Sequence, residues 1–249
     1  MYTQAANTVK NARRIAVFTG AGISVESGIP PFRGENGLWS KYDPQSLEIN
    51  YFHANPDHAW VVIKEIFYDF FGAAKPNAAH RGVAALEQHN LVHTVITQNI
   101  DNLHQEAGSG EVFEFHGNSQ YLLCLNCGKR SHISEIDLDT LPPLCTECGG
   151  LLKPDFVFFG EPIPVRASTR AFEEAQKSDL FILIGTTGEV MPAAMVPTAA
   201  KRNGATIIEI NTEPSLYTNN ITDIFLQAKA TEAMTGLLAA LDIPLPEAT

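Results

Sequence analysis

The sequence has 249 residues, of which 45% are apolar and 18% charged, and its formal net charge is −11 at pH 7. This length and composition suit one large domain, or one domain with a smaller insert, around a sizeable core. The acidic balance and the lack of any basic stretch argue against nonspecific nucleic-acid binding, which needs clustered Lys and Arg. The surplus acid either keeps the surface soluble or favours a cationic partner.

The N-terminal residues from Met1 to Arg14 are polar and contain no apolar segment of the kind that directs secretion. No apolar run elsewhere in the sequence approaches the length that crosses a bilayer. We therefore expect a cytoplasmic protein. The chain opens with a predicted helix over residues 4–12 and a short buried strand over residues 15–19.

A glycine-rich stretch follows this strand and reads GAGISVESGIPPFR from Gly20 to Arg33. Its glycines let a ligand approach bare backbone, and residues 23–27 are expected to begin a helix whose free N–H groups face a phosphate. A dinucleotide fingerprint has glycine at its sixth position, where this chain has Val25. The stretch alone is therefore compatible with a nucleotide site and equally with an ordinary strand-to-helix turn.

Two helices are predicted next in the chain. Residues 34–37 form a polar, glycine-rich turn that is suited to a mobile loop. Apolar and aromatic side chains then recur every three or four residues between 56 and 71, which predicts a helix packed over the main sheet. A second helix is expected over residues 77–89, with Asn77 as its N-cap.

Polar side chains end the next predicted strand, which covers residues 91–97. Gln98, Asn99 and Asp101 follow it, and open α/β sheets place their ligands at such strand ends. A cap for the following helix would account for Asp101 alone. The other two polar residues therefore point to a binding site.

His116 is the best candidate for a general base among the eight histidines. It ends a short predicted strand over residues 111–115, and an imidazole titrates near neutral pH. We expect the glycine that follows, Gly117, to leave room for a substrate. The other histidines lie in helical, strand-interior or turn contexts and are weaker candidates: His53, His58, His80, His89, His93, His104 and His132.

All four cysteines lie in two Cys-x2-Cys pairs, Cys124 with Cys127 and Cys145 with Cys148, separated by seventeen residues. Two such pairs can hold one zinc ion tetrahedrally. Two disulfides or free thiols are the alternatives, and disulfides are disfavoured in a chain without a secretion signal. We predict one structural zinc ion, because four protein ligands leave no open position for catalysis.

The C-terminal half continues the alternation of strands and helices. The segment 153–161 carries four consecutive apolar residues, 156–159, which cannot all face one core, so it is expected to pair with something or to line a pocket. Helices are predicted over 165–177, 192–202 and about 231–241, and buried strands over 180–184 and 205–210.

This alternation predicts an α/β fold with a doubly wound, Rossmann-like parallel sheet. Two segments interrupt it and are expected to fold together into a smaller lobe, made of a helical module and a zinc ribbon. The larger domain would comprise residues 1–35, 77–117 and 154–249, and the smaller one residues 36–76 and 118–153. The cleft between them is the expected ligand site.

Several motifs occur in a combination and order that are typical of one family. They are GAGISVESGIPPFRG, TQNIDNLHQEAGS, FHG, the two cysteine pairs, KPDFVFFGE, GTTGEVMPAA and IEIN. With these motifs the chain resembles the sirtuins, NAD-dependent protein-lysine deacylases, of bacterial or archaeal type. The resemblance extends from about residue 10 to residue 241.

The resemblance implies a binding site for the co-substrate NAD. Gly20, Ala21, Gly22 and the following helix start would hold the pyrophosphate, while Phe32 and Arg33 would lie over the nicotinamide ribose. Closure of the 34–37 loop would keep water from the reaction. The other implied contacts are Gln98, Asn99, Ile100 and Asp101 at the nicotinamide and its ribose, Gly185, Thr186 and Thr187 at phosphate and ribose, and Asn211, Thr212, Glu213 and Ala230 around the adenosine.

The resemblance also implies the chemistry. Asn99 and Asp101 would hold the nicotinamide and stabilise cationic character at the ribose carbon as its bond breaks. His116 would be the catalytic base that deprotonates a ribose hydroxyl, so that the acyl group leaves lysine for ADP-ribose. The partner, an acyl-lysine protein or peptide, would pair in extended form with the backbone of Val157, Phe158, Phe159 and Gly160.

The chain departs from the family pattern in places. Sirtuins that prefer succinyl or malonyl groups carry a Tyr and, three residues later, an Arg over the acyl pocket, whereas here Tyr68 is followed by Phe71. We therefore expect acetyl or longer apolar acyl groups to be preferred over acidic ones. Pro31, Gly188 and Glu189 also depart from the usual residues, with no predicted effect.

Two other functions are compatible with the sequence. The same site could support ADP-ribosyl transfer or plain NAD hydrolysis. Alternatively, the chain could be a non-catalytic zinc-ribbon module that recognises nucleic acid or protein and uses nucleotide only as a structural ligand, although the acidic balance argues against nucleic acid. An ordinary dehydrogenase is disfavoured, because the glycine fingerprint is incomplete and no acidic residue ends a strand about twenty residues after Gly20.

Overall fold

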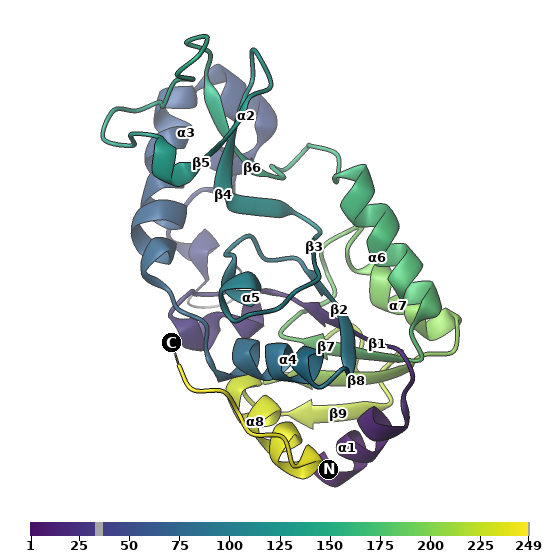
Figure 1. The fold of residues 1–249 in the computed structure, drawn as a ribbon. Helices are drawn as coiled ribbons and strands as arrows, with labels where there is room; N and C mark the ends of the chain where they lie inside the picture. The colour runs from purple at the N-terminus through teal and green to yellow at the C-terminus, as the bar shows by residue number, and fades with distance from the viewer. Residues whose placement is uncertain (33–36, 249) are drawn as a thin grey trace.

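The computed structural model describes residues 1–32 and 37–248. Its main element in those residues is a sheet of six parallel strands in the spatial order β3-β2-β1-β7-β8-β9 (Figure 1). The strands are β1 (Ile15–Thr19), β2 (Val92–Thr97), β3 (Val112–Glu114), β7 (Leu180–Ile184), β8 (Thr206–Asn211) and β9 (Ile224–Gln227). The predicted doubly wound, Rossmann-like sheet is confirmed.

Helices cover both faces of this sheet (Figure 1). One face carries α1 (Tyr2–Asn11), α4 (Ala78–Gln88) and α8 (Ala230–Leu241), and the other carries α6 (Val165–Lys177) and α7 (Met195–Arg202). The central strands β1 and β7 are buried along their whole length. Parallel strands covered on both faces have continuous apolar sequences, which is why these two could be predicted from their apolar runs.

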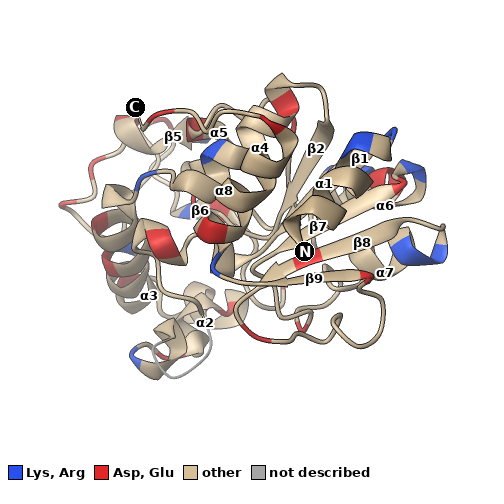
Figure 2. Cartoon of the chain, turned by 90° about the horizontal axis from the view of Figure 1, so that it is seen from below, with Lys and Arg blue, Asp and Glu red and all other residues tan. Residues whose placement is uncertain are grey.

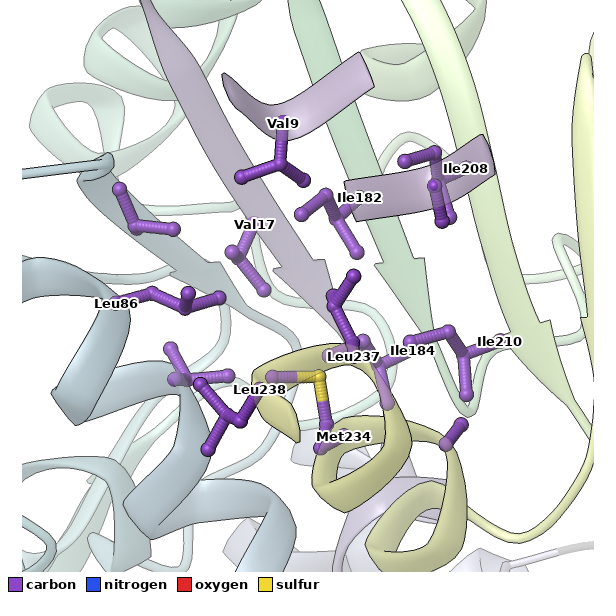
Figure 3. Close-up of a cluster of buried hydrophobic side chains, with 14 of the residues drawn as sticks. Val9, Val17, Leu86, Ile182, Ile184, Ile208, Ile210, Met234, Leu237 and Leu238 are labelled. Carbon is purple, nitrogen blue, oxygen red and sulfur yellow. The ribbon is translucent and has the colours of Figure 1, made fainter. Parts of the chain in front are cut away.

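Side chains of the central strands alternate between two cores. Val17, Ile182 and Ile208 face the α8 side, where Met234 and Leu237 pack with them (Figure 3). The apolar residues beside them along each strand, such as Phe18, Leu183 and Ile207, belong to the cluster beneath α6 and α7. Burial of each Leu or Ile side chain stabilises the folded state by about 1.5–3 kcal/mol. The well-packed sheet therefore holds the residues at its strand ends in place.

A smaller lobe lies beyond one end of the sheet, in the upper part of Figure 1. It contains the antiparallel strands β4 (Gly117–Cys124), β5 (Arg130–His132) and β6 (Leu152–Phe156) and the helices α2 (Ile49–Ala54) and α3 (Pro56–Ile63). Aromatic side chains form its own core, among them Phe52, Trp60 and Phe67. The indole N–H of Trp60 donates to the carbonyl of Leu152 over 2.9 Å, which ties α3 to β6.

The helical stretch predicted over residues 56–71 is present, but it is not one regular α-helix, and it packs in the core of the small lobe and not over the main sheet. The α-helix α3 ends at Ile63, and residues 64–70 continue as a π-helix. The wider π-turn lets Phe67 and Phe71 both reach the core, with ring centroids 5.4 Å apart, while Phe67 also packs on Phe156 at 5.0 Å. Aromatic packing overrode the regular helical period that the sequence pattern assumes.

Other element boundaries also differ from the prediction. The strand expected over 153–161 ends at Phe156 in β6, so the predicted domain boundary between residues 153 and 154 falls inside this strand. The four-residue edge strand β9 was not predicted, because so short a run carries little periodicity. The helix expected after Asn102 is one turn long, α5 (Leu103–Glu106).

Acidic residues are spread over most of the fold, and several basic residues lie at the ends of α6 and α7 (Figure 2). Lys177 is in the last turn of α6, and Lys201 and Arg202 are in the last turn of α7. Among the described residues, no helix has both the length and the apolar character needed to cross a membrane.

Candidate functional site

The carboxyl ends of four neighbouring strands meet at one edge of the main sheet. Thr19 at the end of β1 pairs in register with Thr97 of β2 and with Ile184 of β7, and Ile184 pairs with Ile210 of β8. From β1 the chain continues to β2 and β3 on one side, and the later strands β7, β8 and β9 lie on the other side of β1, so the strand order reverses here and this edge is a topological switch point. Open α/β sheets bind ligands in the crevice at this position.

A cavity of about 860 Å³ lies at this edge. It is lined by the predicted residues Gly20, Ala21, Gly22, Phe32, Gln98, Asn99, Ile100, His116, Val157, Phe158, Phe159, Gly160, Gly185, Thr186, Thr187, Asn211, Thr212 and Ala230. Asp101 lies behind the wall and Glu213 is exposed outside it. Arg33 and most of the 34–37 loop lie outside the described residues.

The glycine turns after β1 and β7 pack directly against each other. The N–H of Gly22 donates to the carbonyl of Gly185 over 2.9 Å, and a Cβ added to Gly22 would lie 2.5 Å from the Cα of Gly185. Gly185 has a φ of 63°, in the left-handed region. A side chain at either position would therefore force the two turns apart and change the cavity floor.

The helix expected to start at residue 23 is wrong. Two short 3-10 turns, Ala21–Ile23 and Val25–Ser27, occupy this segment, and Gly28 ends it with a φ of 92°. Ser24 lies between the two turns, and its hydroxyl contacts Asp101 and Asn99, which are distant in the sequence. The backbone at the predicted phosphate site therefore forms close turns and does not begin a helix.

Ser24 connects two of the predicted catalytic residues and was itself missed. Its Oγ donates to Oδ2 of Asp101 over 2.7 Å and accepts from Nδ2 of Asn99 over 3.1 Å. Nδ2 of Asn99 also donates to the carbonyl of Gly20 over 3.2 Å. The amide nitrogen of Asn99 is thus held by the protein, so the amide orientation is fixed. The only sequence signal for Ser24 was its place inside the glycine-rich stretch.

Asp101 supports this arrangement from behind. Its Oδ1 accepts from the backbone N–H of Leu103 over 3.1 Å at the start of α5. Burial raises the pKa of Asp101, while its hydrogen bonds from Ser24 and Leu103 act in the opposite direction. Asp101 therefore serves both predicted purposes. Its Oδ1 binds the first N–H of α5, and its Oδ2 binds Ser24 at the site.

Two histidines that were ranked as weak candidates lie behind the same wall. Nε2 of His80 is 3.4 Å from the hydroxyl of Ser24, and Nε2 of His104 is 2.9 Å from the hydroxyl of Thr19. Burial lowers the pKa of His80, assisted by the nearby His104, and burial lowers the pKa of His104 to about 4. Both rings are therefore neutral near pH 7 and serve as fixed hydrogen-bonding groups.

His116 is held in one tautomer at the cavity wall. Its Nδ1 is 2.9 Å from the carbonyl oxygen of Gln98. A carbonyl can only accept, so Nδ1 carries the proton and Nε2 keeps its lone pair. Burial lowers the pKa of His116, and the hydrogen bond to Gln98 partly opposes that change. The ring is therefore neutral near pH 7 and can accept a proton at Nε2.

The expected role of Gly117 is wrong. A Cβ at this residue would lie 2.4 Å from the carbonyl oxygen of Asp155 and 2.8 Å from the Cα of Phe156. The space beside the glycine is filled by strand β6, so it is not available to a substrate. Gly117, with a φ of 79°, instead allows the small lobe to pack tightly beside His116.

The segment after β6 connects to His116 and leaves part of its backbone free. The N–H of Val157 donates to the carbonyl of His116 over 2.8 Å, and the N–H of Phe159 donates to the carbonyl of Leu47 over 2.9 Å. Within the described part of the chain, the carbonyl of Val157 and the N–H of Gly160 have no hydrogen-bond partner. One acceptor and one donor therefore remain for a ligand in the cavity.

Polar contacts also join the other strand ends. Nε2 of Gln98 donates to the hydroxyl of Thr186 over 3.0 Å, and Nδ2 of Asn211 donates to the carbonyl of Thr186 over 3.1 Å. Among the described cavity-lining residues, the charged side chains are Glu26, Glu161 and Lys229. Most of the wall is therefore neutral and apolar, with polar groups concentrated at the strand ends.

The four cysteines form the predicted metal site. Their Sγ atoms all lie within 4.8 Å of one another, with Cys124 and Cys148 3.5 Å apart and Cys127 and Cys145 3.8 Å apart. A tetrahedron with zinc–sulfur bonds of about 2.3 Å has sulfur atoms roughly 3.8 Å apart. The donor set and its spacing therefore fit one zinc ion, and this site is separate from the cavity lining.

A family profile and a curated relative both match most of this chain. The profile described as the Sir2 family matches residues 20–192. A protein of Aeropyrum pernix named NAD-dependent protein deacylase is 44% identical over 247 residues, which cover 97% of this chain and 98% of that protein.

Solved structures agree with this comparison. A Sir2 variant with a deacetylated p53 peptide and 3′-O-acetyl ADP ribose has a TM-score of 0.91 and 33% identity, covering 97% of this chain and 98% of that one. A complex of a Sir2 homologue with NAD has a TM-score of 0.88 and 36% identity, covering 96% and 93% of the two chains.

Proposed function

Because the chain belongs to the Sir2 family, also called the sirtuins, we propose that it is an NAD-dependent protein-lysine deacetylase. It cleaves NAD to nicotinamide and transfers the acyl group from lysine to ADP-ribose. The observation that carries this proposal is the neutral His116, with Nδ1 bound to Gln98, at the wall of a cavity that also contains Asn99 and the free backbone of Val157 and Gly160.

The cavity fits NAD in size and in chemistry. Its volume of about 860 Å³ is within the usual range for cofactor sites, and its apolar walls carry a few fixed polar groups. When bound, NAD supplies a reactive ribose carbon and nicotinamide as leaving group. The turns at Gly20–Gly22 and Gly185–Thr187 would hold its phosphates, and Asn211 with Ala230 would contact the adenosine.

Asn99 is proposed to orient the nicotinamide. Its amide nitrogen is already bound to Ser24 and the carbonyl of Gly20, so its Oδ1 remains as an acceptor for an N–H of the ligand. Asp101 fixes this orientation through Ser24, so it is a positioning residue. Such preorganised polar groups stabilise charge as it develops, because they need no rearrangement during the reaction.

His116 is proposed to act as the general base. Its Nε2 accepts the proton of a ribose hydroxyl, which then attacks the acyl carbon and carries the acyl group away from lysine. The carbonyl of Gln98 keeps the proton on Nδ1 throughout and stabilises the ring once it is charged. An extended peptide would use the free carbonyl of Val157 and N–H of Gly160 as a strand addition.

The pH dependence of the reaction provides a test of this base. Because burial lowers the pKa of His116, the neutral ring persists below the ordinary histidine value of about 6.5. We expect the acid limb of kcat/KM, measured over roughly pH 5 to 8, to have its midpoint below the ordinary histidine value of about 6.5. A parallel unfolding profile serves as control, and an acid limb centred above 6.5 would contradict the assignment.

The preferred acyl group is also predictable. Lys229 is the one cationic side chain among the described cavity-lining residues, and it adjoins Ala230 at the proposed adenosine end. Tyr68 does not line the cavity, and its hydroxyl donates to the carbonyl of Ser119 over 3.1 Å. A carboxylate on the acyl group would therefore be buried without a partner, at a cost of about 3 kcal/mol or roughly 100-fold.

The measurement is a comparison of acyl-lysine peptides with NAD. We expect kcat/KM to be highest for acetyl or apolar acyl groups and roughly 100-fold lower for succinyl-lysine. Butyryl-lysine is the matched control, because it has the same number of acyl carbons as succinyl-lysine without the carboxylate. Equal rates for the butyryl and succinyl peptides would contradict the prediction.

A further inference from the structure

A buried lysine lies directly beneath the segment that is proposed to bind the peptide. Lys153 on β6 is 5% exposed. Its Nζ donates to the carbonyls of Pro154 and Phe156 over 2.9 and 2.8 Å and to Oε2 of Glu161 over 2.9 Å. It also lies 4.2 Å from the ring centroid of Phe158. All three N–H donors of the ammonium group are therefore used, which is the condition for burying such a charge.

Glu161 closes the same segment from its other end. Its Oε2 accepts from Lys153 and also from the backbone N–H of Phe158 over 2.8 Å. The N–H of Glu161 donates back to the carbonyl of Phe158 over 3.0 Å, and Gly160 between them has a φ of 90°. Oε2 of Glu161 thus fixes a tight turn from Phe158 to Glu161. Lys153 contacts both ends of this turn and also the carbonyls of strand β6 beneath it.

This turn decides which groups reach the cavity. Phe158 is locked into the small-lobe core, with ring centroids 5.2 Å from those of both Phe52 and Phe156. Phe158 also borders the cavity, together with its neighbours Val157 and Phe159, of which Phe159 is 45% exposed. Glu161 binds the N–H of Phe158 and so fixes the turn. In this turn the carbonyl of Val157 and the N–H of Gly160 are both available to a ligand in the cavity.

Stability alone does not account for a pair of this kind. A buried ion pair contributes little net stability, and apolar residues of similar size often replace one without loss. The contacts of this pair instead define a shape, because Nζ bridges two carbonyls on β6 and a carboxylate five residues after the strand ends. A neutral replacement would fill the space without specifying the turn.

We propose that Lys153 and Glu161 are positioning residues that hold residues 157–160 in the conformation that binds an acyl-lysine peptide. This inference rests on the proposed deacetylase function. It predicts an effect on the peptide and not on NAD, because the pair contacts the substrate segment and neither of the glycine turns.

The test measures the KM values of both substrates in Lys153→Met, which keeps a long side chain and removes the three donors. We expect the KM for an acetyl-lysine peptide to rise about tenfold or more, with the KM for NAD within about twofold of wild type. The matched control is Lys64→Met, which breaks the partly exposed pair with Asp69 (2.8 Å) in the same lobe and should leave both KM values unchanged.

Glu161 gives an independent comparison if Lys153→Met cannot be purified. Glu161→Gln keeps an oxygen that can accept from Phe158, whereas Glu161→Ala keeps none, so the peptide KM should rise more in the alanine variant. The proposal would be overturned if Glu161→Gln and Glu161→Ala had equal KM values for the peptide. It would also be overturned if the KM values for NAD and for the peptide rose in parallel. A wild-type protein that makes no acetyl-ADP-ribose would instead refute the deacetylase function itself.

Discussion

Replacing His116 by alanine is expected to abolish acyl transfer while NAD still binds. The side chain supplies the only histidine nitrogen with a free lone pair among the described cavity-lining residues. Loss of a positioned general base costs about 100-fold to 10,000-fold in rate. The fold should persist, because the link from residue 116 to Val157 uses the backbone carbonyl. Acetyl-ADP-ribose is measured by mass spectrometry, and NAD affinity by calorimetry.

His89 provides a matched control for this substitution. Its Nδ1 also donates to a backbone carbonyl, that of Ala85, over 2.9 Å, but the residue is the C-cap that follows α4 and does not line the cavity. His89→Ala should therefore keep wild-type activity. Acyl transfer by His116→Ala within tenfold of wild type would show that another group accepts the ribose proton.

Replacing Cys145 by alanine should release zinc and unfold the small lobe. The two buried ligands, Cys124 and Cys145, belong to the same core cluster as Leu152 and Phe156. Structural zinc contributes an apparent free energy of about 10–16 kcal/mol in small zinc-binding peptides, so its loss is comparable to the whole stability of a typical domain, about 5–15 kcal/mol. Metal content and thermal unfolding measure the effect, with wild-type protein expected to carry one zinc ion per chain.

The control for this substitution is Ser131→Ala, which alters a buried side chain on β5 of the same sheet without removing a ligand. That variant should keep its zinc and unfold at nearly the wild-type temperature. A Cys145→Ala protein that is stable and fully loaded with zinc would show that the fourth thiolate is dispensable, and the closed structural site would then be wrong.

The parts of the fold that were predictable are those whose sequence carries a local signal. The helix over 165–177 and the strand over 180–184 were predicted with the bounds that the structure shows, because amphipathic and continuous apolar patterns identify such elements. The aromatic stripe from 56 to 71 carried an equally clear period. Its π-helical half was missed because it depends on packing against Phe156, which is distant in sequence.

The candidate site was predictable where strand ends carry polar residues. Gln98, Asn99 and His116 were found in this way and lie at one cavity. Ser24 was not found, since its partners Asn99 and Asp101 are more than seventy residues away along the chain. Long-range hydrogen bonds of this kind have no signature in a single sequence.

Gly117 shows the same difference between a local signal in the sequence and a contact that only the fold creates. The sequence indicated that Gly117 leaves space beside His116, but it did not identify the group that fills this space. The structure shows backbone of β6 there, whereas sequence reasoning assigned the space to a substrate. A glycine therefore indicates a close approach, and only the fold identifies what approaches.

The product balance tests the central claim most directly. Purified protein is incubated with an acetyl-lysine peptide and NAD, and all products are quantified by mass spectrometry. We expect one nicotinamide, one deacetylated lysine and one acetyl-ADP-ribose for each NAD consumed. Free ADP-ribose with the peptide still acetylated, or ADP-ribose attached to the peptide, would contradict the account and identify the activity as NAD hydrolysis or ADP-ribosyl transfer.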